Sequence, residues 1–278
     1  METLGYYNGT IGELHEISVP MLDRVCYFGD GVYDATYAHN HVIYCLEEHV
    51  DRFFHSAALL RMEIPCTKEE LKTLLSDLVR KVDSGDQFVY WQLTRGTGIR
   101  NHLPTEGPGN LWVMLRPAEV QDTYGKLNLI TLEDTRFLHC NIKTLNLLPN
   151  VMAVQKTHEA GCDEAILHRG DMVTECAHSN VHILKDSVLK THPTDHLILP
   201  GIARQNLIRA CKTLGVAVDE TPFTVAELFD ADEVIVSSSG SFCVAAATID
   251  GKPVGGKAPE TLKKLQDFLV ADFEEKTK

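Results

Sequence analysis

The chain has 278 residues, of which 44% are hydrophobic and 23% charged, and its formal net charge is −13. This size allows one large domain or two modest ones, and the composition is that of an ordinary globular protein. The acidic excess argues against a nucleic-acid or anionic-membrane surface. We find no apolar run long enough for a bilayer and no signal-peptide pattern at the N-terminus, so we expect a cytoplasmic location.

In the first part of the chain, the expected strands follow one another and the expected helices follow one another, instead of alternating. Asn8-Gly9 between two β-rich runs predicts a tight hairpin. Apolar residues at helical spacing predict two helices, the second opening with a capping box from Thr67 to Glu70. The expected strands also cover 32–38, 42–46, 88–94 and 111–115, and the helices 47–60 and 67–82. Grouped rather than alternating elements predict an α+β domain over residues 1–118.

A polar stretch without periodicity, residues 119–125, is the best linker candidate. A second series of elements follows it, and Gly161 and Gly215 stand where two of its helices should end. The expected strands are 126–132, 164–168, 172–175, 181–184, 188–191 and 233–237, and the helices are 150–160, 201–214 and 261–275. We therefore expect a C-terminal domain over residues 126–278.

Lys143 is a basic residue among aliphatic ones, in the run Asn141-Ile142-Lys143-Thr144-Leu145. Burial disfavours the charged form of a lysine, so such an amine is a candidate nucleophile toward carbonyl groups. A strand-end lysine with its ammonium in water is the alternative, which this residue alone leaves open.

Two segments of the C-terminal part could bind an anion. Gly201 opens a helix, and the N–H groups at a helix start attract negative charge. The serines of 237–241 follow a strand, where hydroxyl and N–H groups could surround a phosphate. An ordinary helix cap and a flexible serine loop are the alternatives. Glu175 lies in an apolar strand and would need a cationic partner if it is buried.

Arg100 and His102 form an Arg-x-His triplet in a loop, which could bind a carboxylate, although a solvated loop is the commoner reading. Tyr33 follows a glycine turn and could be either a core aromatic or a pocket hydroxyl. The cysteines and histidines show no spacing that suggests a metal site.

In this order the motifs resemble the fold-type IV pyridoxal-phosphate enzymes, and most closely the D-amino-acid (D-alanine) aminotransferases. The resemblance covers nearly the whole chain and is carried by Phe28–Tyr33, Glu48–Arg52, Arg100–His102, Ile142–Asn146, Glu164–Leu167, Thr174-Glu175 with Ser179-Asn180, and Gly201–Arg204. It implies a smaller N-terminal α+β domain and a larger C-terminal mixed α/β domain with a barrel-like sheet. The C-terminal domain would carry the Schiff-base lysine and most of the cofactor site.

The resemblance also implies residue roles. Lys143 would be the Schiff-base lysine of pyridoxal 5'-phosphate, and Glu175 the partner of its pyridine nitrogen. The other cofactor contacts would be Arg52, Leu199, Ile202, Ala203, Ser238 and Ser239, with Leu199 packed against the ring. The substrate α-carboxylate would be held by Tyr33, Arg100 and His102. In this family the arginine and histidine come from the partner subunit, so a homodimer is implied.

Four residues depart from the family pattern. Ala203 stands where threonine is common, and Gly240 replaces a hydroxyl residue near the phosphate. His178 stands in a run usually made of small serines, and Asp34 where glutamate is usual. These departures concern substrate range and cofactor affinity more than the type of reaction.

The implied activity is transamination of D-amino acids with a 2-oxo acid such as 2-oxoglutarate. Two enzymes of the same fold are alternatives: an aminodeoxychorismate lyase and a branched-chain L-amino-acid aminotransferase. The Arg-x-His triplet favours the D-aminotransferase over both. A non-catalytic binder of a phosphorylated ligand is the alternative from another class of protein. The preferred D-amino acid and the physiological role stay open.

Overall fold

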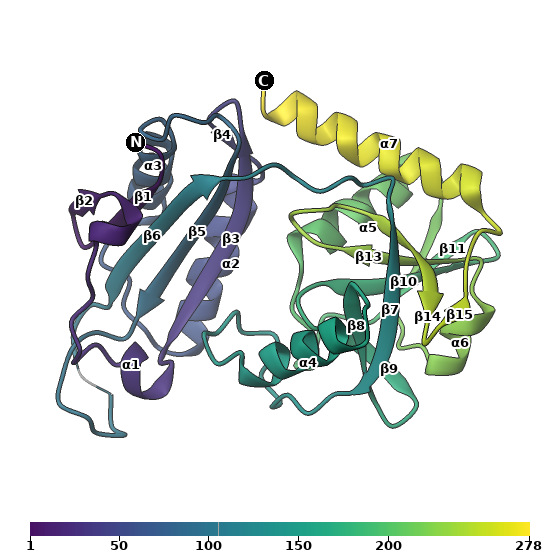
Figure 1. The fold of residues 1–278 in the computed structure, drawn as a ribbon, viewed down its shortest axis with the longest axis horizontal. Helices are drawn as coiled ribbons and strands as arrows, with labels where there is room; N and C mark the ends of the chain where they lie inside the picture. The colour runs from purple at the N-terminus through teal and green to yellow at the C-terminus, as the bar shows by residue number, and fades with distance from the viewer. Residues whose placement is uncertain (105) are drawn as a thin grey trace. The chain divides into compact units, whose positions relative to one another are not determined.

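The computed structural model describes residues 1–104 and 106–278, which form two compact units (Figure 1). Unit 1 comprises Met1–Val120, Ile142–Asn146 and Phe273–Lys278, and unit 2 comprises Gln121–Asn141 and Leu147–Asp272. The first change of unit lies within the expected linker. The segment that carries Lys143 folds with unit 1, whereas we expected it in the C-terminal domain.

Unit 1 contains a six-stranded antiparallel sheet in the order β2-β1-β6-β5-β3-β4. Its strands are β1 (Leu4–Tyr7), β2 (Thr10–Gly12), β3 (Gly31–His39), β4 (Val42–Ile43), β5 (Gln87–Thr94) and β6 (Asn110–Pro117). The short helical turns are η1 (Leu14–Glu16) and α1 (Val25–Phe28). Asn8 and Gly9 both have positive φ, as the hairpin between β1 and β2 requires.

Helices α2 (Leu46–Leu59) and α3 (Lys68–Val79) pack on this sheet (Figure 1). Burial alternates along β3 and β6, so every second side chain points into the core. Trp91 of β5 and Phe53 of α2 meet edge to face and are fully buried. The predicted capping box is present, because Thr67 and Glu70 bond each other's backbone N–H groups and fix the start of α3.

Unit 2 contains a nine-stranded mixed sheet in the order β12-β11-β10-β13-β14-β7-β8-β9, with β15 paired to β14. Its strands are β7 (Lys126–Glu133), β8 (Glu164–Arg169), β9 (Met172–Cys176), β10 (Asn180–Lys185), β11 (Val188–Thr191), β12 (Ala217–Asp219), β13 (Glu233–Ser237), β14 (Val244–Ile249) and β15 (Lys252–Pro253). The helices are α4 (Leu148–Glu159), α5 (Ile202–Leu214), α6 (Val225–Asp230) and α7 (Pro259–Lys276), the last of which continues from Phe273 on into unit 1. Helix α4 connects the parallel strands β7 and β8, and α5 connects the parallel strands β11 and β12.

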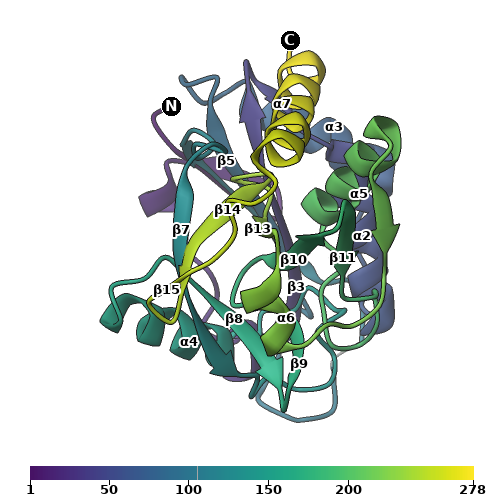
Figure 2. The same cartoon turned by 90° about the vertical axis from the view of Figure 1, so that its right-hand side faces the viewer.

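The sheet of unit 2 curls on itself (Figure 2). Strand β9 lies at one edge of the strand order and β10 lies near the other, yet residues 177–179 suffice to connect them. The amide of Asn180 at the start of β10 donates to Glu175 on β9 over 2.8 Å. This closure gives the barrel-like sheet that we expected, and it brings the ends of several strands together.

Some elements were not expected from the sequence, namely η1, α1, α6, β12, β14 and β15. Across residues 1–104 and 106–278, no helix combines the length and the apolar character that crossing a membrane would require.

Candidate active site

The segment around Lys143 is held on the first residues of β3 by backbone bonds. Lys143 O accepts from Tyr33 N over 2.9 Å, and Leu145 N donates to Gly31 O over 3.0 Å. The N–H of Lys143 donates to the hydroxyl of Ser56 on α2 over 3.2 Å. A Cβ at Gly31 would lie 2.5 Å from the backbone oxygen of Leu93 and 2.6 Å from Leu145 Cδ1, so the position requires glycine. The backbone of Lys143 is therefore fixed from both sides.

The side chain of Lys143 is partly buried and lies against an aromatic pair. Its Nζ is 4.3 Å from the ring centroid of Tyr33, within the range of a cation–π interaction. Tyr33 stacks on Tyr90, with ring centroids 5.5 Å apart. Burial, and then the neighbouring Tyr33, raise the pKa of Tyr90. Of the predicted site residues in unit 1, Lys143 and Tyr33 are thus brought together.

Arg52 lies in a buried polar cluster beneath β3. Its Nε and Nη2 donate to the two carboxylate oxygens of Asp34 over 2.9 and 2.7 Å. His49 Nδ1 lies 2.7 Å from Asp34 Oδ1. Burial alone would raise the pKa of Asp34, but Arg52 and His49 together hold it well below its usual range. Asp34, one of the departures from the family pattern, therefore fixes the guanidinium that we expected to contact a phosphate.

The side chains of Arg100 and His102 both lie against the ring of Phe28. The Arg100 guanidinium lies 5.0 Å from the ring centroid of Phe28, and the His102 ring lies 5.2 Å from it. Both side chains are exposed, and Arg24 supports the loop by donating to the carbonyl of Asn101 over 2.6 Å. Within the described part of this chain, none of the contacts recorded for Arg100 and His102 joins them to Tyr33.

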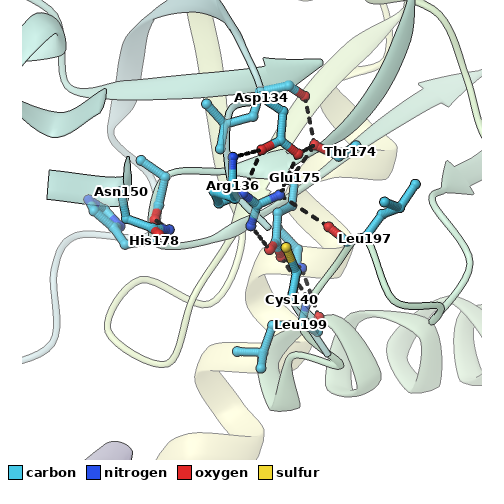
Figure 3. Close-up of polar contacts among 12 residues, drawn as sticks. Asp134, Arg136, Cys140, Asn150, Thr174, Glu175, His178, Leu197 and Leu199 are labelled. Atoms are coloured by element: carbon cyan, nitrogen blue, oxygen red, sulfur yellow. Dashed lines mark hydrogen bonds and ion pairs between the residues drawn. The ribbon is translucent and has the colours of Figure 1, made fainter. Parts of the chain in front are cut away.

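Glu175 is buried on β9 and has an arginine partner that the sequence analysis missed (Figure 3). Arg136 donates through Nη1 to Glu175 Oε1, and its other nitrogens contact Asp134 at 2.9 Å. Burial opposes the charge of Arg136, but the bonds to Asp134 and the charge of Glu175 outweigh it and raise the pKa of Arg136. Burial would raise the pKa of Asp134, but Arg136 and then Arg169 lower it to about 2. Arg136 is therefore the cation that a buried Glu175 requires.

The second oxygen of Glu175 is connected to the start of α5. Asn180 Nδ2 donates to Glu175 Oε2 over 2.8 Å, and the N–H of Leu199 donates to it over 3.0 Å. Gly201, the residue before α5, makes no side-chain cap, so the N–H groups of the first helical turn, which begins at Ile202 and Ala203, have no side-chain partner from it. Four residues that we expected to share one site thus lie on connected segments of unit 2, namely Glu175, Leu199, Ile202 and Ala203.

The serine loop lies at the same end of the sheet. Ser237 ends β13 directly opposite Asn180 of β10 in the antiparallel ladder. The hydroxyls of Ser238 and Ser241 are 2.8 Å apart, and the N–H of Phe242 donates to Ser238 O over 2.9 Å. Because Asn180 also reaches Glu175, the two predicted anion-binding segments and the carboxylate converge at one place.

His178 occupies the connection between β9 and β10. Its Nδ1 lies 2.8 Å from Oε2 of Glu164, a carboxylate buried on β8, while the imidazole itself is largely exposed. Ser179 also donates to this oxygen, over 2.6 Å. Burial would raise the pKa of Glu164, but His178 and Ser179 lower it. This departure from the family pattern therefore balances a buried carboxylate.

Comparison with known proteins identifies the family. A family model described as amino-transferase class IV matches residues 31–249. The D-alanine aminotransferase of Listeria monocytogenes serotype 4b (strain F2365) is 41% identical over 273 residues, which cover 96% of this chain and 94% of that protein. The chain belongs to the class IV aminotransferases. A further relative, the D-alanine aminotransferase of Bacillus licheniformis, is 37% identical over 276 residues, covering 96% and 97%.

Solved structures of class IV aminotransferases share this fold. The T.th. branched-chain amino acid aminotransferase with pyridoxamine 5'-phosphate matches with a TM-score of 0.89 and 27% identity, covering 98% of this chain and 94% of that one. The branched-chain amino acid aminotransferase from Escherichia coli matches with a TM-score of 0.90, but at 22% identity it shows the fold alone. The predicted family, the fold-type IV class and the aminotransferase reaction are confirmed.

Proposed function

We propose that this class IV aminotransferase transfers the amino group of D-amino acids, of which D-alanine is the first candidate, to a 2-oxo acid such as 2-oxoglutarate. The observation that carries the D-specific part is the 41% identity to a D-alanine aminotransferase over nearly the full length of both chains. The identity to the branched-chain enzyme of matching structure is lower, 27%. The relatives do not favour a lyase or a non-catalytic binder. A cytoplasmic location stays a prediction.

The residues of unit 2 fit pyridoxal 5'-phosphate. A phosphate dianion suits the uncapped start of α5 together with the serine loop, because both present N–H or hydroxyl donors. Glu175 would accept from the pyridine N–H, with Arg136 balancing its charge. Its carboxylate has about four lone-pair sites, which suits several donors at once. Ile202, Ala203, Ser238 and Ser239 would hold the phosphate, and Leu199, whose N–H Glu175 fixes, would pack against the ring.

The residues of unit 1 would supply the amine and a phosphate contact. When bound, the cofactor supplies an electrophilic carbonyl and an electron sink. Lys143 would hold the cofactor at this carbonyl through Nζ, and its free amine would move a proton to and from the substrate Cα. The two bonds from Arg52 to Asp34 orient its guanidinium, so it would meet the phosphate with little loss of side-chain freedom. Tyr33, beside Nζ, would contact the substrate.

A homodimer follows from the proposed substrate trap. Arg100 and His102 would bind the α-carboxylate of a substrate in the partner subunit's site, while this chain's site receives Arg100 of the partner subunit. Large apolar side chains are exposed beside this loop, namely Met21, Leu22, Ile99 and Leu103. Such a group of exposed apolar residues is typical of a surface that another chain covers.

Steady-state assays of the enzyme test the proposal. With 2-oxoglutarate as acceptor, D-alanine should be converted to pyruvate and L-leucine should react far more slowly. Turnover of L-leucine alone would overturn the D-specific reading in favour of a branched-chain L-aminotransferase. The purified protein should absorb visible light through its cofactor, and Lys143→Ala should abolish both this absorbance and the activity.

A further inference from the structure

His182 is buried inside unit 2 beneath the segments that we assign to the phosphate. It lies on β10, two residues after Asn180 and on the same face of the strand, and is 0% exposed. Its Nε2 lies 2.8 Å from the hydroxyl of Ser237, the residue that leads into the serine loop. Its Nδ1 lies 2.8 Å from the hydroxyl of Thr191 on β11. The imidazole thus bridges two hydroxyls that belong to different strands.

The other end of this chain of contacts is Arg204, in the first turn of α5. Its Nε donates to Thr191 Oγ1 over 3.3 Å, and its Nη2 donates to the carbonyl of His192 and to Glu220 Oε2 over 2.9 and 2.7 Å. Arg204 is itself 2% exposed. A chain of hydrogen bonds therefore connects the start of α5 to the serine loop through the interior of unit 2. It runs from Arg204 through Thr191 and His182 to Ser237.

Arg204 also fixes the direction of the hydrogen bonds. Burial, and then the charge of Arg204, lower the pKa of His182 to about 3, so the imidazole is neutral and carries one proton. The positive charge lies on the Thr191 side, which favours the tautomer protonated on Nε2, away from Arg204. Thr191 then donates to Nδ1, and Nε2 donates to Ser237 Oγ. The proton of the Ser237 hydroxyl is left to point away from His182.

We propose that His182 is a positioning residue, which transmits the placement of Arg204 to Ser237 and so fixes the serine loop for a phosphate monoester. This rests on the proposed function, because it assigns the two anion-binding segments to one phosphate group. The hydroxyl of Ser237, oriented by His182, and the first turn of α5, oriented through Arg204, would keep a constant separation. A phosphate dianion needs such a separation to accept donors from both segments at once.

Two substitutions separate hydrogen bonding from packing. His182→Phe removes both bonds and leaves the hydroxyls of Thr191 and Ser237 without this partner. His182→Gln keeps an acceptor for Thr191 and a donor for Ser237. Ile183→Val is the matched control, because Ile183 is equally buried on the same strand and lies outside the chain of contacts. Thr191→Val breaks the chain one step earlier without a change of shape and replaces His182→Phe if that variant does not fold.

The measured quantities are dissociation constants of the cofactor-free enzyme for pyridoxal 5'-phosphate and for pyridoxal, which lacks the phosphate. We expect His182→Phe to weaken binding of pyridoxal 5'-phosphate by about tenfold, the effect of one or two lost hydrogen bonds, and to leave pyridoxal unchanged. His182→Gln and Ile183→Val should remain within about threefold of the wild type for both ligands, since each keeps the bonds or lies outside them. Wild-type affinity for pyridoxal 5'-phosphate in His182→Phe, or an equal loss for both ligands, would overturn the proposal.

Inorganic phosphate separates this inference from the proposed function. If the wild type binds no pyridoxal 5'-phosphate, the proposed function fails, but the effect of inorganic phosphate on Tm still tests His182. A rise in Tm with inorganic phosphate that is kept in His182→Gln and lost in His182→Phe supports the positioning role. An equal rise in both variants, or none in the wild type, overturns it.

Discussion

Asn180 and Gly201 are so close that a Cβ on Gly201 would lie 2.0 Å from Asn180 Oδ1. The φ of Gly201 is −66°, which any residue can adopt, so the requirement for glycine is steric. Through its amide nitrogen Asn180 also donates to Glu175 and to the carbonyl of Leu199. One side chain therefore sets the spacing between the strand that carries Glu175 and the start of α5.

Gly201→Ala should disturb this spacing, because either the helix start or Asn180 must move. We expect binding of pyridoxal 5'-phosphate to weaken by about tenfold or more, as for the loss of a charged hydrogen bond. A double-mutant cycle with Asn180→Ala checks the cause, since removal of the amide relieves the clash. The double variant should bind no worse than Asn180→Ala alone. Additive losses would contradict the steric explanation.

Arg136→Met should lower the free energy of unfolding by about 3–5 kcal/mol, because it leaves the buried Glu175 without its cation. Asp134 would keep only Arg169, whose Nε lies 3.1 Å from Oδ2. Urea denaturation measures the change. Arg209→Met is the control, since Arg209 pairs with Asp272 over 2.7 Å but is 41% exposed, and its loss should cost about 1 kcal/mol or less. A similarly small effect at Arg136 would show that the buried network does not depend on it.

Acid should destabilise the protein partly through His182. Its pKa is 6.5 in ordinary surroundings and about 3 in the folded chain. Between these values the unfolded chain binds a proton that the folded chain does not, so the free energy of unfolding falls as the pH falls from about 6.5 toward 3. His182→Gln removes this contribution. The stability of the wild type relative to His182→Gln should therefore fall by roughly 1.4 kcal/mol per pH unit within this window.

The lowered pKa of Asp34 acts in the same direction, since its stabilising effect is lost as the pH falls through the folded pKa, but it is common to both proteins and cancels in the comparison. Guanidinium-chloride unfolding at pH 6, 5 and 4 provides the data. Parallel curves for the wild type and His182→Gln would contradict a neutral, buried imidazole.

Mixed dimers of Lys143→Ala and Arg100→Ala test the proposed subunit arrangement. Each variant alone should be nearly inactive with D-alanine. If Arg100 acts on the partner's site, a mixed dimer has one site with both substitutions and one site with neither. Unfolding and refolding of an equimolar mixture should then restore about a quarter of the wild-type activity, since about half of the dimers are mixed. No recovery would place Arg100 and Lys143 of the same chain in one site.

Local signals in the sequence predicted much of the fold. Asn8-Gly9, the capping box at Thr67 and Gly215 each act within a few residues, and the structure has the expected turn, helix start and helix end. Helix α6 was missed although Thr224 and Glu227 form the same capping box. Strand β14 was missed because it is rich in alanine, which has a low preference for strands.

The partners of the site residues could not be predicted in the same way. Arg136 meets Glu175 across 39 positions of sequence, and beside Asp134 it looks like an ordinary surface charge pair. His182 carries no motif, and its role depends on Arg204, Thr191 and Ser237 arriving from three other elements. Such contacts follow from how the sheet of unit 2 curls, which no short stretch of sequence encodes.

Residues 142–146 belong to unit 1 although the chain on both sides of them belongs to unit 2, and this has a consequence for folding during synthesis. Thr144 bonds Gly31 across 113 positions of sequence, and residues on both sides of the segment belong to unit 2. A ribosome that has released only residues 1–120 has therefore not yet supplied Lys143, nor the C-terminal residues that complete unit 1. Lys143 therefore reaches its place late, after long-range closure of the chain, and isolated fragments of either half should lack a properly placed lysine.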